Sequence, residues 1–118
     1  RPDGIAEVEK LFTSCRQTDD LEIWVSNDRM PSLCALLNVR CGWLMFLRFE
    51  GDTGFSSRNP SGEQSERGEE VFVLANGQVD AYPRSWTFDR AGIFDALLEF
   101  AKSGDRPSNV EWHDDSLN

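Results

Sequence analysis

The sequence predicts an α+β fold in one domain, residues 1–118, with a mostly antiparallel sheet of about five to six strands and two helices packed on one face. Two segments with apolar residues at helical spacing flank a run of strand-like segments. An Asn-Gly pair separates two of these strand-like segments, which is typical of a hairpin. Because runs of strands between helices indicate an α+β fold, we expect helices and sheet to form separate layers.

The first helix is predicted over residues 3–17, where Asp3 can cap the first turn. Its apolar residues recur at helical spacing, and Thr18 begins a polar stretch that breaks the pattern. The apolar positions are Ile5, Val8, Leu11, Phe12 and Cys15.

The second helix is predicted to be capped by Thr87 or Asp89 and to run to about Lys102. Gly104 can then adopt the left-handed conformation that ends a helix. Trp86 is positioned to pack onto the first turn as a hydrophobic staple. The predicted buried stripe consists of Ile93, Phe94, Leu97, Leu98 and Ala101.

Three strands are predicted in the first half of the chain. Residues 21–25 alternate with period two, whereas residues 33–39 and 43–49 are nearly continuous apolar runs. Such runs are typical of strands buried on both faces. A single buried helix is the alternative, which Gly42 disfavours.

A hairpin is predicted where residues 71–74 and 78–82 flank Asn76-Gly77, because both turn residues tolerate a positive φ. Val110 and Trp112 share one face of a short last strand. Residues 50–69 are polar and rich in Gly, Ser and Glu, which predicts a long exposed loop. Two helices cover only one face of the sheet, so the loop, a second copy or a partner would cover the other.

The chain is acidic, with 21 Asp and Glu against 12 Lys and Arg and a formal net charge of −9. This charge repels phosphate backbones and anionic lipid, so neither nucleic acid nor membrane is an expected partner. A basic protein surface is the complementary partner. The Asp and Glu residues crowd the 50–69 loop, where the ordinary interpretation is a solvated surface and the sharper one is an anionic docking patch.

The residues that could carry chemistry are few, so no enzyme, metal or cofactor is predicted. His113 is the only histidine and stands among acidic residues near the C-terminus, as a solvated surface histidine would. The chain has three cysteines, and the spacing of Cys34 and Cys41 is not that of a zinc motif. An odd, sparse set of thiols without a signal peptide or long apolar run favours the reduced cytoplasm.

The second half of the chain resembles a family of bacterial immunity proteins. The matching pieces are a strand ending in Tyr82-Pro83, a helix carrying Glu99-Phe100, and a closing segment from Ser103 to Trp112. Within that segment stand Gly104-Asp105-Arg106-Pro107 and Val110-Glu111-Trp112, and residues 55–60 also look like a loop of some relatives. The resemblance implies an α+β domain, encoded beside a polymorphic toxin, that blocks the toxin by binding it. Such toxins are often nucleic-acid deaminases.

If the resemblance holds, the partner is a cognate toxin domain, deaminase-type or nuclease-type, with a basic active-site groove that carboxylates would occupy. Trp112 is either a core residue or an aromatic contact to that partner. A homodimer is left open but not predicted. A generic acidic adaptor or regulatory subunit with a non-toxin partner is the alternative function. The partner-binding residues predicted from the loop and the C-terminus are Glu50, Asp52, Phe55, Arg58, Glu63, Glu66, Glu69, Glu70, Trp112, Asp114 and Asp115.

Overall fold

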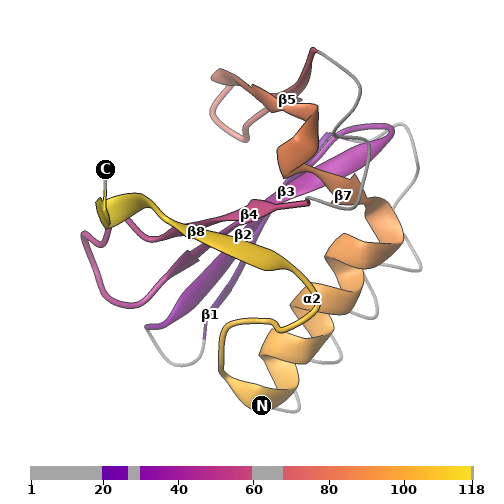
Figure 1. The fold of residues 1–118 in the computed structure, drawn as a ribbon. Helices are drawn as coiled ribbons and strands as arrows, with labels where there is room; N and C mark the ends of the chain where they lie inside the picture. The colour runs from indigo at the N-terminus through magenta and orange to yellow at the C-terminus, as the bar shows by residue number, and fades with distance from the viewer. Residues whose placement is uncertain (1–19, 27–29, 60–67, 118) are drawn as a thin grey trace.

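A six-stranded antiparallel sheet forms the centre of the computed structural model, which describes residues 20–26, 30–59 and 68–117. Five strands follow one another in the order β1-β2-β3-β4-β8, and β7 pairs with β3 beside β4 (Figure 1). The strands are β1 (Leu21–Ser26), β2 (Ser32–Leu37), β3 (Cys41–Leu47), β4 (Phe55–Arg58), β7 (Phe88–Asp89) and β8 (Glu111–Asp114).

Two further layers cover the central sheet, a helix on one face and a two-stranded hairpin on the other (Figure 1). The hairpin is a separate sheet of β5 (Glu69–Val73) and β6 (Val79–Pro83), and the helix is α2 (Arg90–Ser103). Short 3₁₀ turns, η1 (Arg84–Trp86) and η2 (Asp115–Leu117), follow β6 and β8.

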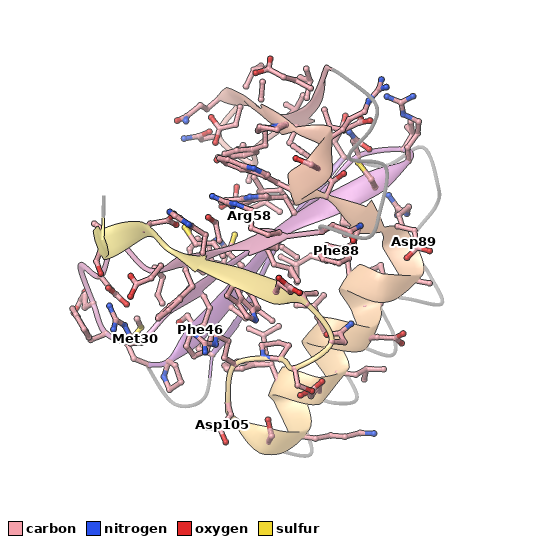
Figure 2. All side chains as sticks on the ribbon, in the orientation of Figure 1. Met30, Phe46, Arg58, Phe88, Asp89 and Asp105 are labelled. Carbon is pink, nitrogen blue, oxygen red and sulfur yellow. The ribbon has the colours of Figure 1, made fainter. Side chains whose placement is uncertain are left out.

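The helix-side core is made of hydrocarbon side chains. Because side chains alternate along a strand, the odd-numbered residues of β2 and the even-numbered residues of β3 point toward α2. Phe46, labelled in Figure 2, has ring contacts with Phe100 of α2, Phe55 of β4 and Trp112 of β8, at centroid distances of 6.1, 6.3 and 6.3 Å. The fully buried members include Leu33, Leu37, Leu44, Ile93, Leu97 and Phe100.

The hairpin-side core is smaller and richer in aromatic rings and sulfur. It contains Cys34, Leu36, Cys41 and Trp43 from the sheet and Phe72 from β5. Tyr82 of β6 stacks on Trp43 with ring centroids 4.1 Å apart and planes 6° from parallel. The hairpin therefore covers the face of the sheet that two helices alone were expected to leave open.

The predicted hairpin is confirmed. Its strands are paired in the register Val73↔Val79, and Gly77 has a φ of 91° in the turn. The Leu74 N–H donates to the Gln78 carbonyl at 2.8 Å. Asn-Gly thus supplies the positive φ that a tight turn requires.

The ends of α2 are also as predicted. The Asp89 carboxylate accepts the Gly92 N–H at 2.8 Å, so Asp89 rather than Thr87 is the N-cap. Gly104 has a φ of 76°, and its N–H donates to the Phe100 carbonyl.

Several predictions were wrong. The prediction of two helices is not borne out, since α2 is the one α-helix within the described residues and the helix predicted over 3–17 lies outside them. Residues 50–69 are not one long loop, because 55–58 form β4 and β5 starts at Glu69. Trp86 stacks near Tyr82 of the hairpin, at 6.0 Å, and belongs to the hairpin-side core instead of stapling α2.

Candidate functional site

Pairing of β4 with β8 brings the two predicted binding segments together. Phe55 pairs with Asp114 and Ser57 with Trp112 in the antiparallel register. The Asp115 N–H donates to the Gly54 carbonyl at 2.9 Å, which extends the contact into the turn before β4. We call this end of the sheet the acidic edge, and its members are Glu50, Asp52, Phe55, Asp114 and Asp115.

Asp52 and Asp114 of the acidic edge are held in place by local hydrogen bonds. Arg48 donates to both oxygens of Asp52, from Nε at 2.8 Å and from Nη2 at 2.9 Å. These bonds hold the pKa of Asp52 well below its usual range. Asp114 accepts the Ser116 hydroxyl at 2.6 Å, which likewise lowers the pKa of Asp114. Both side chains are therefore anions at neutral pH.

Phe55 lies between two arginines. The guanidinium of Arg48 is 4.9 Å from the centre of the ring and that of Arg106 is 4.4 Å from it. Cation–π contacts of this kind hold both guanidinium groups against the Phe55 ring, and Arg48 also pairs with Asp52. Sequence reasoning missed both arginines, because Arg106 stands in a segment that capping and chain reversal explain on their own.

Arg58 is turned inward. It lies between the edge of the sheet and the hairpin, with its guanidinium 3.6 Å from the centre of the Trp86 ring (Figure 2). Its Nη1 donates to the Ser56 hydroxyl and to the Ser57 carbonyl, each at 2.9 Å. Burial lowers the pKa of Arg58, whereas the charge of Asp115 raises it. Arg58 thus joins η1, which directly follows the hairpin, to β4.

Trp112 packs against the helix-side core, and its indole N–H donates to the Pro107 carbonyl at 2.9 Å. The ring is half-buried, so of its two interpretations the core role describes its contacts. Trp112 therefore fixes β8, which carries Asp114 and is followed directly by Asp115.

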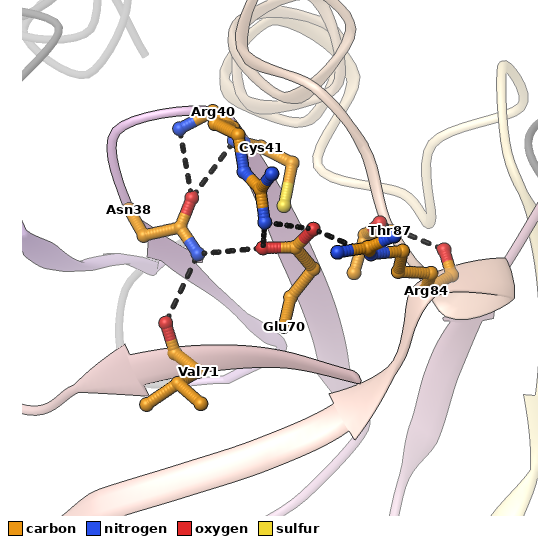
Figure 3. Close-up of polar contacts among 7 residues, drawn as sticks. All are labelled: Asn38, Arg40, Cys41, Glu70, Val71, Arg84 and Thr87. Atoms are coloured by element: carbon orange, nitrogen blue, oxygen red, sulfur yellow. Dashed lines mark hydrogen bonds and ion pairs between the residues drawn. The ribbon is translucent and has the colours of Figure 1, made fainter. Parts of the chain in front are cut away.

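Glu69 and Glu70 lie on the hairpin, apart from the acidic edge. Glu69 is exposed, whereas Glu70 is buried. The Glu70 carboxylate accepts hydrogen bonds from Arg40, Arg84 and Asn38, at 2.8 Å for the shortest (Figure 3). We call these four residues the Glu70 cluster. Glu63 and Glu66 lie outside the described residues.

Burial alone would raise the pKa of Glu70, but the hydrogen bonds from Arg40 and Asn38 and the charges of Arg40 and Arg84 lower it. The Glu70 carboxylate is therefore ionised, and its hydrogen bonds are made to groups within the protein. Asn38 also donates to the Val71 carbonyl at 3.0 Å and accepts the Cys41 N–H at 3.0 Å. The Glu70 cluster anchors the base of the hairpin to the β2–β3 turn.

A pocket of about 440 Å³ opens where β4, β7 and the start of β8 meet. Sequence reasoning missed it, because its walls come from three separate segments. Its lining combines charged and amide side chains with the apolar side chains of Phe88 and Val110. The lining residues are Arg58, Asn59, Phe88, Ser108, Asn109, Val110 and Glu111.

The two thiols within the described residues, Cys34 and Cys41, are buried rather than activated. Burial raises the pKa of Cys34 to about 12 and that of Cys41 to about 11. The His113 Nε2 lies 3.7 Å from an oxygen of Asp115 at the surface. Among the described residues, no three His, Cys, Asp or Glu side chains gather as metal ligands. No helix within the described ranges is long and apolar enough to cross a membrane.

The fold and the surface define the class of the protein, an α+β domain whose polar groups form a charged, preorganised edge. A model of the family described as immunity protein Imm1 matches residues 4–114. The chain belongs to this family, so the resemblance first seen in the second half of the sequence extends over nearly the whole chain. The family is generally non-enzymatic. No curated protein matches the chain.

Proposed function

We propose that this protein neutralises a cognate bacterial toxin by binding it and covering its active site with the acidic edge. The observation that carries this proposal is the convergence of ionised carboxylates from two distant segments on the paired strands β4 and β8. Family membership supplies the partner class, a toxin. We further propose that the toxin is of the deaminase or nuclease type and that this protein binds it in the cytoplasm.

The charge of the edge supports this toxin class. An enzyme that acts on nucleic acid needs a basic groove to hold phosphates. Asp114 is already oriented by Ser116, so its carboxylate enters that groove at little further cost of ordering, whereas the Asp52 side chain is only 2% exposed and holds Arg48 in place. Opposite charges also speed the encounter of the two proteins.

A titration into the reaction of the toxin encoded beside this chain tests the proposal. The wild-type protein is expected to abolish turnover at a one-to-one ratio and to form a stable complex. Reversing Glu50 and Asp114 to lysine is expected to weaken binding at least about tenfold, chiefly through slower association at low salt.

The matched control reverses Asp95 and Asp105 to lysine, which changes the net charge equally on exposed positions of α2 and the turn after it. This control is expected to bind within about threefold of the wild type. Full toxin turnover in excess wild-type protein would refute the function. Equal weakening of binding by both double variants would show that the acidic edge acts only through the net charge of the chain.

A further inference from the structure

An exposed tryptophan is fixed in one orientation at the far edge of the sheet. Trp24 of β1 is 49% exposed, although tryptophan is highly buried on average. Its indole N–H donates to the Glu22 carboxylate at 2.7 Å. Trp24 pairs with Cys34, whose side chain belongs to the hairpin-side core, so Trp24 also lies on the hairpin side of the sheet.

Glu22 ties this tryptophan to the tip of the hairpin. Its second carboxylate oxygen accepts the Ala75 N–H at 2.9 Å, from the turn between β5 and β6. The hydrogen bonds from Trp24 and Ala75 hold the pKa of Glu22 below its ordinary value. One carboxylate thus orders both the indole and the turn before any partner arrives.

The outer face of the hairpin is apolar and exposed. Val71 is 50% exposed, Val73 39% and Val79 60%. The register places Val73 opposite Val79 and Val71 opposite Ala81, so these side chains form one continuous strip. The inner face of the hairpin is already filled by Phe72 and Tyr82, so packing within the chain does not require the outer strip.

We propose that Trp24, Glu22 and this valine strip form a second docking surface for the cognate toxin, with Trp24 as its anchor. We call it the hairpin surface, and it rests on the proposed function. Tryptophan is the residue most enriched among energetically dominant interface contacts. Because Trp24 is held by Glu22, it loses little side-chain entropy on binding.

The charges around the hairpin surface determine which kind of partner fits it. Glu22 lies at the tip of the hairpin with Asp80 near it, whereas Arg40 and Arg84 are both paired with Glu70 at the base of the hairpin. The fitting partner has an apolar patch flanked by Lys or Arg. A second copy would bring another chain of net charge −9 against the same carboxylates, and an anionic lipid surface would be repelled as well.

One toxin domain can reach both surfaces. Trp24, Cys34, Met45, Ser56 and His113 form a cross-strand row on the hairpin side of the sheet. Four strand spacings separate its ends by about 19 Å. A standard interface of roughly 800 Å² per partner spans that distance. The hairpin surface would supply residence time and the acidic edge would supply association rate.

The test measures toxin affinity for Trp24→Ala and Val79→Lys, using the same toxin domain and the full chain. Each variant is expected to raise Kd at least about tenfold, mainly through faster dissociation. Ala91→Lys is the matched control, since it adds the same charge on the exposed side of α2. It is expected to change Kd by less than about twofold. Thermal melting of each variant confirms the fold, and Val79 is exposed enough that Lys is accommodated.

The outcomes separate the two proposals. Wild-type protein that neither binds nor inhibits the toxin overturns the proposed function and this inference with it. Wild-type protein that inhibits, together with unchanged Kd for folded Val79→Lys and Trp24→Ala, overturns the inference alone. A wild-type dimer that Val79→Lys dissociates, with no effect on toxin binding, assigns the strip to a second copy and also overturns it.

Discussion

The two faces of the central sheet are held by different forces. On the helix side, hydrocarbon side chains from β2, β3 and α2 interlock, and six of the larger ones are fully buried. On the hairpin side, a small aromatic core is supplemented by directional contacts of the Glu70 cluster and by Arg58 on Trp86. On the helix side, stabilisation by burial is spread over many contacts. On the hairpin side, the side-chain hydrogen bonds that define the Glu70 cluster all depend on the Glu70 carboxylate. The hairpin should therefore detach from the sheet more readily than the helix.

The largest effect is expected from Phe100→Ala on the helix side. Phe100 is 1% exposed and has an edge contact with Phe46, so truncation leaves a cavity that costs about 3–5 kcal/mol. Chemical denaturation should show a lower midpoint for the whole domain. Phe49→Ala, at a 55% exposed ring, is the control and should cost less than about 1 kcal/mol. Similar losses for both variants would contradict the packing described for the helix side.

Glu70→Gln is expected to have a smaller and more local effect. The free energy of unfolding should fall by about 1–3 kcal/mol, because Arg40 and Arg84 lose the negative charge of Glu70 while Arg40 stays partly solvated. Hydrogen exchange should quicken in β5 and β6 and stay slow in β2 and β3. Cys34 and Cys41, both on the hairpin side, should become reactive toward a thiol reagent.

Glu69→Gln is the matched control, because its side chain is exposed on the adjacent position of the same strand. It should leave the exchange and thiol labelling of the wild type unchanged. If Glu70→Gln unfolds the whole domain at once, the two sides are not independent and the comparison fails.

Acid pH should remove the contribution of Glu70 without a substitution. The pKa of Glu70 is lower in the folded protein than in the unfolded chain, so its stabilisation is complete above the ordinary glutamate pKa, about 4.3. It is lost as the pH falls through the folded value. The difference in unfolding free energy between the wild type and Glu70→Gln should therefore shrink between pH 7 and pH 3. A constant difference over this range would show that the Glu70 charge contributes nothing.

The fold could be predicted from sequence where structure is determined locally. Asn76-Gly77 determines its turn, Asp89 and Gly104 determine the ends of α2, and apolar runs mark β2 and β3. β4 was missed because Phe55-Ser-Ser-Arg has no apolar alternation. The second half of β4 is held by residues that are distant in the sequence. The Ser57 hydroxyl accepts the Leu44 N–H and donates to the Trp86 carbonyl.

The candidate site was only partly predictable for a related reason. The carboxylates of the acidic edge were proposed from composition and the family resemblance as two separate patches, because composition treats all carboxylates alike and does not show that β4 pairs with β8. Nothing local distinguishes buried Glu70 from exposed Glu69, because the difference comes from Arg40 and Asn38, some thirty positions away. No sequence pattern marks Trp24 as exposed, because tryptophan is usually buried, yet in the structure it is 49% exposed.

The pairing of β4 with β8 also has a consequence for the folding pathway. Ser56 and Asp115 are 59 positions apart, whereas β2 and β3 join through a turn of a few residues. The entropy of closing so large a loop favours early formation of the β2–β3 pair and late docking of β8. The acidic edge then exists only when folding is complete. A partly folded chain would lack the surface proposed to bind the toxin, so recovery of inhibition during refolding would time the last step of assembly.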